Sequence, residues 1–217
     1  MKLLLTSGGI ENKAMTNALR ELVGKDFKDA KLVFIPTAAN VEAGDKWWLI
    51  KDLTTCKELG FKEVDIVDIA AVSRDIWLPR LEDTDVIMVG GGNTSYLMKQ
   101  IRESGLAKEL PALLATRVYV GISAGSMVVA PKLREKEMQR VYNEPVDEDA
   151  ENDGLNLVDF LVVPHMNNPY FPRAAERIDE VAQDIDMPLY AIDDQTAIKV
   201  IDANVEVISE GTWKKYN

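Results

Sequence analysis

The chain has 217 residues, which is enough for one hydrophobic core and slightly short of two full domains. Hydrophobic residues make up 47% and charged residues 28% of the sequence, the balance of an ordinary globular protein. The net charge of −11 repels a phosphate backbone, so the composition argues against a nucleic-acid partner.

Membrane and secretion signals are absent from the sequence. No apolar run approaches the roughly 18 residues typical of a membrane span, and the first residues lack the long apolar region of a secretory signal. The one cysteine, Cys56, excludes an intrachain disulfide and fits a reducing compartment. We therefore expect a cytoplasmic protein with no membrane partner.

In the first half of the chain, short apolar runs alternate with segments of helical periodicity. The apolar runs predict strands at residues 3–5, 31–35, 64–67 and 85–89. The helical segments are expected at residues 14–23, 47–59 and 95–101.

The second half continues the same alternation. Further helices are expected at residues 106–115 and 174–185, and further strands at residues 117–120, 160–163 and 189–192. Two last apolar runs, at residues 196–201 and 205–208, flank a turn and predict a C-terminal β-hairpin. Near-continuous apolar strands alternating with helices predict a single three-layer α/β domain over residues 1–217, with a mostly parallel sheet covered by helices on both faces.

The stretch at residues 143–153 differs from its surroundings because it is strongly acidic and almost free of apolar residues. Such a composition is typical of a solvated loop. Since it lies between the two best catalytic candidates described next, a role as a lid is an alternative.

The segment Gly121-Ile-Ser-Ala-Gly125 matches the G-x-S-x-G pattern and directly follows the strand predicted at residues 117–120. A sharp turn from strand to helix holds the central hydroxyl clear of the sheet, and flanking glycines relieve the crowding. Ser123 is therefore the predicted nucleophile of a serine hydrolase, against the alternative of a tight turn that happens to contain serine.

A serine hydroxyl needs a neighbouring base to take its proton. The chain has one histidine, His165, which follows the predicted strand at residues 160–163. Functional groups gather at the carboxyl ends of strands in open α/β sheets, so His165 is the predicted base.

The run Gly90-Gly-Gly-Asn-Thr94 also follows a predicted strand. Its glycines let backbone amides approach a ligand closely, which predicts half of an oxyanion hole, completed by the amide of Ala124. Asn93 is a candidate for capping the next helix or for contacting substrate. The nucleotide-binding glycine patterns fail here, and one histidine and one cysteine do not make a metal site, so no cofactor and no metal are expected.

These motifs together resemble the peptidase E (aspartyl dipeptidase) family, which includes cyanophycinase. The likeness covers nearly the whole chain and also includes Val163-Pro-His165 and Ala191-Ile-Asp-Asp194. It implies a glutamine-amidotransferase-like fold and a serine peptidase that cleaves after an N-terminal aspartate. By this resemblance Ser123 is the nucleophile, His165 the base, and Gly91, Gly92 and Ala124 surround the oxyanion.

The third member of the triad stays open. The resemblance implies an acidic residue about fifteen positions after the serine, where this chain has Met138. Glu137 is the preferred candidate, with Glu135 and Asp194 as alternatives. A family member that has lost its activity and serves as a binding protein therefore remains a second hypothesis, as does another α/β serine hydrolase such as an esterase.

The resemblance also implies an arginine that holds the aspartate side chain of the substrate, and Arg173 is the matching residue. A guanidinium suits bidentate binding of a carboxylate. The expected partners are thus a small peptide substrate and, as the resemblance suggests, a second copy in a homodimer. Glutamine amidotransfer is disfavoured because that chemistry uses cysteine at the turn and Cys56 lies elsewhere.

Overall fold

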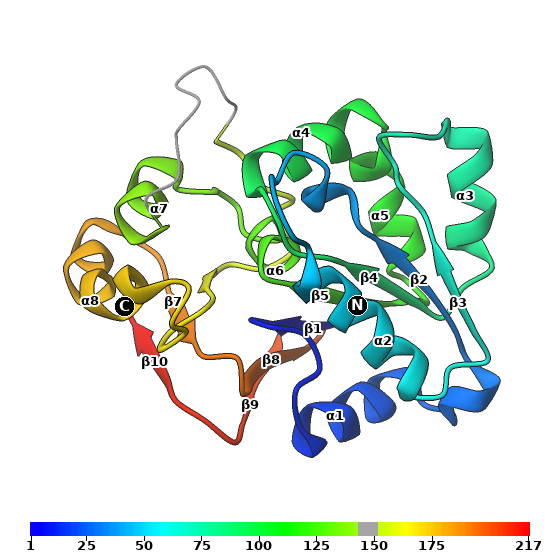
Figure 1. Ribbon diagram of the computed structural model, residues 1–217, viewed down its shortest axis with the longest axis horizontal. Coiled ribbons are helices and arrows are strands. Elements are labelled where there is room, and N and C mark those ends of the chain that lie inside the picture. The colour runs from blue at the N-terminus through cyan, green and yellow to red at the C-terminus, as the bar shows by residue number, and fades with distance from the viewer. Residues whose placement is uncertain (143–151) are drawn as a thin grey trace.

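A computed structural model describes residues 1–142 and 152–217 (Figure 1). Most of the acidic stretch, and with it the lid hypothesis, falls on residues 143–151 and lies outside the described residues. Within the described part, no helix is both long and apolar enough to cross a membrane.

The described strands form two sheets. The larger has the order β3-β2-β4-β5-β1-β8-β9, and the smaller has the order β10-β7-β6. The strands of the larger sheet are β1 (Lys2–Thr6), β2 (Lys31–Ile35), β3 (Glu63–Ile66), β4 (Val86–Val89), β5 (Val118–Ile122), β8 (Thr196–Ile201) and β9 (Asn204–Ser209). Those of the smaller sheet are β6 (Leu161–Val163), β7 (Leu189–Ile192) and β10 (Trp213–Tyr216).

The five strands from β3 to β1 are parallel, while β8 runs antiparallel to β1 and pairs with β9 as a hairpin. Every residue of β4 and β5 is buried, because helices cover both faces of these central strands. The mostly parallel α/β fold and the C-terminal hairpin expected from the sequence are therefore confirmed.

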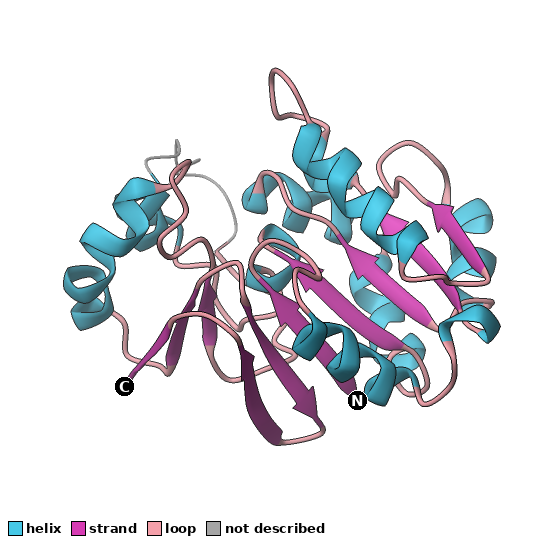
Figure 2. Ribbon diagram, turned by 60° about the horizontal axis from the view of Figure 1, so that its bottom comes forward, coloured by secondary structure: helices cyan, strands magenta, loops and turns pink. Residues whose placement is uncertain are grey.

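Helices lie on both faces of the larger sheet (Figure 2). One face packs against α1 and α2 through Met15, Leu19 and Cys56, and the other packs against α3, α4 and α5. The helices are α1 (Lys13–Val23), α2 (Trp47–Glu58), α3 (Arg74–Glu82), α4 (Thr94–Glu103), α5 (Leu106–Leu113), α6 (Ala124–Met127), α7 (Glu135–Tyr142) and α8 (Pro172–Val181). Single 3-10 turns occur at Phe27–Asp29, Thr37–Ala39 and Ala182–Asp184.

The smaller sheet carries its own apolar cluster. Leu161, Val163 and Leu189 pack there against the inner faces of α7 and α8. Figure 1 shows these two helices beside β7 and β10, next to the larger sheet. The sequence predicted β6 and β7 as strands, but it did not predict that they leave the main sheet or that β10 joins them.

Two helices were not expected from the sequence. In α3 only Trp77 and Leu81 are buried, one turn apart, and Pro79 stands inside the helix. In α7 only Met138 and Val141 are buried, among charged neighbours. A helix that buries two side chains leaves too short an apolar stripe for periodicity to reveal it.

Candidate active site

The carboxyl ends of the central strands bring the sequence motifs to one edge of the sheet. Ser7 follows β1, the triple glycine follows β4, and Ser123 follows β5. Strand register aligns them, since Thr6 pairs with Ile122 and Val89 pairs with Gly121. The motifs expected at this edge of the sheet therefore lie on adjacent strands.

Ser123 sits at the turn from β5 to α6 in a strained backbone conformation. Its φ of 49° and ψ of −110° are unusual for a residue with a side chain. The flanking glycines make the turn possible, because a Cβ at Gly121 would lie 2.6 Å from the carbonyl oxygen of Gly125. A Cβ at Gly125 would in turn lie 2.1 Å from the carbonyl oxygen of Val89.

Hydrogen bonds hold this turn in place. The Ser123 N–H and the Ser126 hydroxyl both donate to the carbonyl oxygen of Thr6, at 3.0 and 2.8 Å. The buried Tyr119 hydroxyl donates to the carbonyl oxygen of Gly125 at 2.6 Å. The strain at Ser123 is thus held by neighbours on β1, β5 and α6.

His165 reaches Ser123 from the other sheet. It follows β6 with a φ of 68°, and its Nε2 lies 2.9 Å from the Ser123 Oγ. The imidazole stacks on the ring of Phe171, with 4.3 Å between ring centroids and 12° between the planes. Its side chain is 12% exposed, so packing restricts the ring to this orientation.

Asp194, at the end of β7, lies on the other side of the imidazole. Its Oδ1 is 3.1 Å from Nδ1 of His165, and its Oδ2 accepts a hydrogen bond from the Asn168 side chain at 2.6 Å. Burial raises the pKa of this carboxyl group, but hydrogen bonds from His165, Ser7 and Asn168 outweigh it and lower the pKa to about 2. Asp194 is therefore ionised at neutral pH.

Ser7 ties the imidazole and the carboxylate together. Its hydroxyl donates to Oδ1 of Asp194 at 2.5 Å and accepts from the backbone N–H of His165 at 2.7 Å. No catalytic role was expected for Ser7 from the sequence. The available signal was a serine shortly after the first predicted strand, at the edge where the other motifs also lie.

The glutamates considered for the third position lie elsewhere. Glu137 forms an ion pair with Arg134 at 3.9 Å, and Glu135 accepts a hydrogen bond from Ser95 at 2.6 Å. Both are on α7, whereas the carboxylate beside the imidazole belongs to Asp194. The preferred candidate Glu137 is therefore not the residue that the structure brings to His165.

The triple glycine packs against the nucleophile. A Cβ at Gly91 would lie 3.2 Å from the Cβ of Ser123, and Gly92 has a φ of 129°. Within the described part of the chain, the N–H groups of Gly91, Gly92 and Ala124 donate no hydrogen bond to another protein group. Asn93 instead caps α4 by accepting from the N–H of Tyr96, so its side-chain oxygen is occupied.

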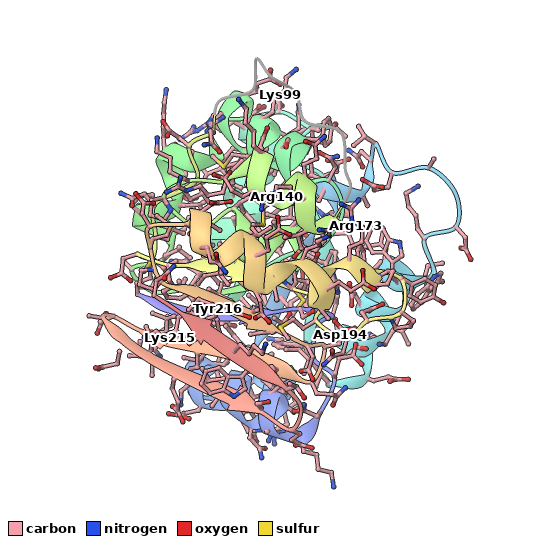
Figure 3. The ribbon with its side chains drawn as sticks, turned by 90° about the vertical axis from the view of Figure 1, so that its left-hand side faces the viewer. Lys99, Arg140, Arg173, Asp194, Lys215 and Tyr216 are labelled. Atoms are coloured by element: carbon pink, nitrogen blue, oxygen red, sulfur yellow. The ribbon has the colours of Figure 1, made fainter. Side chains whose placement is uncertain are left out.

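A cavity of about 390 Å³ opens beside Ser123. Its lining includes Ser123, His165 and Asp194 together with Gly91 and Gly92. Neither Asn93 nor Arg173 lines it. In Figure 3, Arg173 lies on the side of α7, and Asp194 lies on the side of the C-terminal strands. The structure thus does not bring the guanidinium expected to bind substrate into the wall of this cavity.

The cysteine offers no second nucleophile. Cys56 is buried in α2, where burial raises the pKa of its thiol to about 12. Among the described residues, no group of three histidine, cysteine or carboxylate side chains converges as a metal site would require.

Known proteins share the family and the fold of this chain. The sequence model of peptidase family S51 matches residues 3–208 of this chain. An uncharacterized peptidase of Pasteurella multocida is 32% identical over 177 residues, covering 81% of this chain and 83% of that protein. Peptidase E of Nostoc sp. is 25% identical over 201 residues, covering 89% of this chain and 78% of the relative.

A solved structure is similar over the whole fold. A candidate peptidase E of Listeria monocytogenes EGD-e superposes with a TM-score of 0.79 at 26% identity, covering 97% of this chain and 98% of the other. The peptidase of an acI-B1 Actinobacterium has the same fold, with a TM-score of 0.68 at 19% identity over 99% of this chain and 93% of that chain.

The contacts of Ser7 lead to a first prediction. Ser7→Ala removes a donor to the Asp194 carboxylate, which should raise the pKa of that group and loosen the imidazole. Since a hydrogen bond to a charged group is worth about 1.5–3 kcal/mol, we expect kcat to fall about 10- to 100-fold with little change in KM. Steady-state kinetics across pH would measure both effects.

Thr84 provides a matched control for this variant. Its buried hydroxyl donates to the carbonyl oxygen of Lys31 at 3.0 Å; Thr84 precedes β4, whereas Ser123 follows the parallel β5 at the opposite end of the sheet. Thr84→Ala should lower stability and leave kcat unchanged. A Ser7→Ala protein with the kcat and pH profile of the unmodified enzyme would contradict the positioning role of Ser7.

Proposed function

The chain belongs to peptidase family S51 and is a serine-type peptidase, and we propose that it cleaves short peptides through Ser123, His165 and Asp194. The observation that carries the proposal is the continuous chain of contacts from the Ser123 hydroxyl through the imidazole to the Asp194 carboxylate. Such a chain activates a serine that would otherwise be a weak nucleophile. Because the hydroxyl, the imidazole and the carboxylate are all in contact, the geometry also argues against a family member that only binds its ligand.

In the proposed reaction the Asp194 carboxylate accepts a hydrogen bond from Nδ1–H of His165, which leaves Nε2 free to accept the Ser123 proton. The Ser123 Oγ attacks the peptide carbonyl carbon, and the imidazolium that forms beside Asp194 is stabilised by its negative charge. The imidazolium then donates its proton to the leaving amine. Water repeats the sequence on the acyl-enzyme and releases the acid product.

The negative oxygen of the tetrahedral intermediate needs hydrogen-bond donors. Ala124 directly follows Ser123, and Gly92 lines the same cavity; their N–H groups, which donate to no other group in the described part of the chain, are the proposed donors, with Gly91 packed against the nucleophile. Donors that are fixed before the reaction need no reorganisation in the transition state. A Cβ at Gly92 would come within 2.3 Å of the carbonyl oxygen of Ala38, so the backbone path requires glycine there.

The size of the cavity supports a short substrate. A volume of about 390 Å³ lies at the lower end of the range for small-molecule sites, roughly 300–1,000 Å³. One side is formed by Trp47 and Tyr170, whose ring centroids lie 5.7 Å apart. A peptide of a few residues fits this space better than a long chain.

A preference for an N-terminal aspartate is less well supported. It would require a cation in the cavity for the aspartate side chain, and the lysine that lines it, Lys51, forms an ion pair with Glu11. Arg173 does not line the cavity. We therefore propose a short-peptide peptidase without that preference.

The test is a dipeptide panel with aspartate, alanine or lysine at the first position and leucine at the second. Release of free leucine is followed for the wild-type protein and for Ser123→Ala purified in the same way. We expect cleavage by the wild type alone, with Asp-Leu not the best substrate. Cleavage that survives in Ser123→Ala, or no cleavage of any peptide, would overturn the proposal.

A further inference from the structure

Asp52 places an unpaired carboxyl group in the wall of the cavity. The residue is 7% exposed and lines the same cavity as Ser123 and His165. Within residues 1–142 and 152–217, no donor hydrogen-bonds to this carboxyl group and no cation forms an ion pair with it. Buried carboxyl groups normally have such partners, because burying an unpaired polar group costs free energy. A partner supplied by a ligand would remove that cost.

The backbone leaves room for this carboxyl group. Asp52 lies one helical turn before the buried Cys56, so it occupies the face of α2 that turns toward the sheet. Its Oδ1 lies against Gly9, where a Cβ would come within 2.7 Å. Gly9 has a φ of 96°, a conformation that favours glycine. The close approach of this loop to Asp52 thus depends on a residue without a side chain.

The charges around Asp52 favour its neutral form in the absence of a ligand. The pKa of Asp52 is raised to about 8: burial is the largest cause, the negative charge of Glu11 adds to the shift, and the positive charge of Lys51 opposes it. The titratable groups that interact with it are Glu11 from the loop after β1 and Lys51 and Cys56 from α2; the others that line the cavity are Glu42, Asp45, Tyr142, His165, Tyr170 and Asp194.

The cavity as a whole has more negative than positive groups. Glu11 forms an ion pair with Lys51, and Asp194 contacts His165. The three other lining carboxyl groups have no cation partner within the described residues; these are Glu42, Asp45 and Asp52. An empty site with unbalanced carboxylates attracts cations and repels anions.

Aromatic rings add a second feature that suits a cation. Trp47 and Tyr170 line the cavity at its rim with 48% and 70% of their surfaces exposed, and Trp48 and Phe171 lie alongside. The faces of aromatic rings attract ammonium and guanidinium groups, most strongly where water is excluded. Exposed tryptophan and tyrosine next to unpaired carboxyl groups match that chemistry.

We propose that Asp52, with Glu42, Asp45 and the aromatic rim, binds a cationic nitrogen of the substrate. The nitrogen is supplied either by the peptide N-terminus or by a basic side chain of the first residue. The proposal depends on the proposed function for the peptide nature of the ligand, and it goes further in assigning the charge that the site selects.

Binding can be tested without turnover. Calorimetry on the Ser123→Ala protein would compare three probes: alanyl-leucine, with its cation at the N-terminus; Nα-acetyl-arginyl-leucine, with its cation in the side chain; and Nα-acetyl-alanyl-leucine, with neither. We expect at least one cationic probe to bind about tenfold or more tightly than the neutral one. The cationic probe that binds better identifies which nitrogen the site takes.

The decisive variant is Asp52→Asn in the same Ser123→Ala background. It should weaken the cationic probe at pH 8 by about tenfold or more and change the neutral probe by less than about twofold. Glu58→Gln is the matched control, because it removes one negative charge from an exposed position on the same helix. Equal binding of charged and neutral probes, no binding of any probe, or an unchanged Kd in Asp52→Asn would overturn the inference. Failure to cleave peptides, with these binding results intact, would overturn the proposed function alone.

The pH dependence provides an independent measurement. A cation must displace the proton of Asp52, so the ratio of Kd in Asp52→Asn to Kd in the parent should grow about tenfold from pH 7 to pH 9. The ligand's own titration cancels in this ratio. A ratio that stays constant over this range would contradict the role of Asp52.

Thermal unfolding checks that the variant is folded and tests the burial of the charge. The pKa of Asp52 rises from 3.8 to about 8 on folding, so folding takes up a proton between these values. The free energy of unfolding therefore falls as pH rises through that window. Asparagine does not titrate, so the variant does not show this fall. The Tm of Asp52→Asn should exceed that of its parent by an amount that grows from pH 5 to pH 8.

Discussion

Ser123→Ala and His165→Ala are each expected to lower kcat by about 10⁶-fold, and the double variant is expected to lose little more. The reason is that the hydroxyl and the imidazole act as one unit across the 2.9 Å contact, so removing either ends proton transfer. Single-turnover kinetics on the best dipeptide would measure the three variants side by side. Losses that multiply in the double variant would show two independent contributions and contradict the proposed mechanism.

These variants also need to be folded for the comparison to be valid. The Ser123 side chain is not part of the hydrogen bonds that hold the turn, since those use its N–H and the Ser126 and Tyr119 hydroxyls. Ser123→Ala should therefore keep the Tm within a few degrees of the wild type. A large fall in Tm would mean that the loss of activity reports misfolding.

Asp194→Asn is expected to lower kcat by about 10⁴-fold while leaving the geometry nearly intact. The amide can donate to Nδ1, which favours the tautomer with its proton on Nε2 and so deprives Ser123 of its acceptor. It also removes the charge that stabilises the imidazolium. Because the pKa of Asp194 is about 2, the wild type should keep the carboxylate ionised at every pH used for the assay.

Glu137→Gln is the natural control for Asp194→Asn, because both remove one carboxylate without changing size. Glu137 pairs with Arg134 at 3.9 Å, with both side chains half-buried, while the carboxylate that contacts His165 belongs to Asp194. We expect kcat within about twofold of the wild type. A large loss of kcat in Glu137→Gln, with activity retained in Asp194→Asn, would mean that the carboxylate that orients His165 comes from α7 and not from Asp194.

The central part of the fold could be predicted from the sequence because its signals are local. Strand β2 was expected at the residues where it occurs, and the fully buried β4 and β5 appear in the sequence as continuous apolar runs. A parallel sheet buried on both faces requires such runs. The smaller sheet was missed because β10, with the sequence Trp-Lys-Lys-Tyr, is short and mostly exposed.

In the same way, two members of the site could be named before the structure. Ser123 lies in a G-x-S-x-G pattern directly after a predicted strand, and His165 is the one histidine of the chain. Asp194 was included as an alternative, but counting along the chain favoured Glu137. Ser7 and Asp52 were not assigned, although both occupy positions where an apolar residue is the usual choice.

By itself, then, the sequence indicated the proposed nucleophile at the turn after β5, its candidate base and the α/β architecture, since the strand-end motifs and apolar runs behind these predictions are local in the chain. Only the tertiary structure decided which carboxylate orients the base and what lines the cavity. His165 is 42 residues from Ser123 and 158 residues from Ser7, so these contacts depend on how the two sheets meet. Spacing along the chain carries no information about that meeting, because the packing of α7 and α8 on the smaller sheet sets where β6 and β7 end.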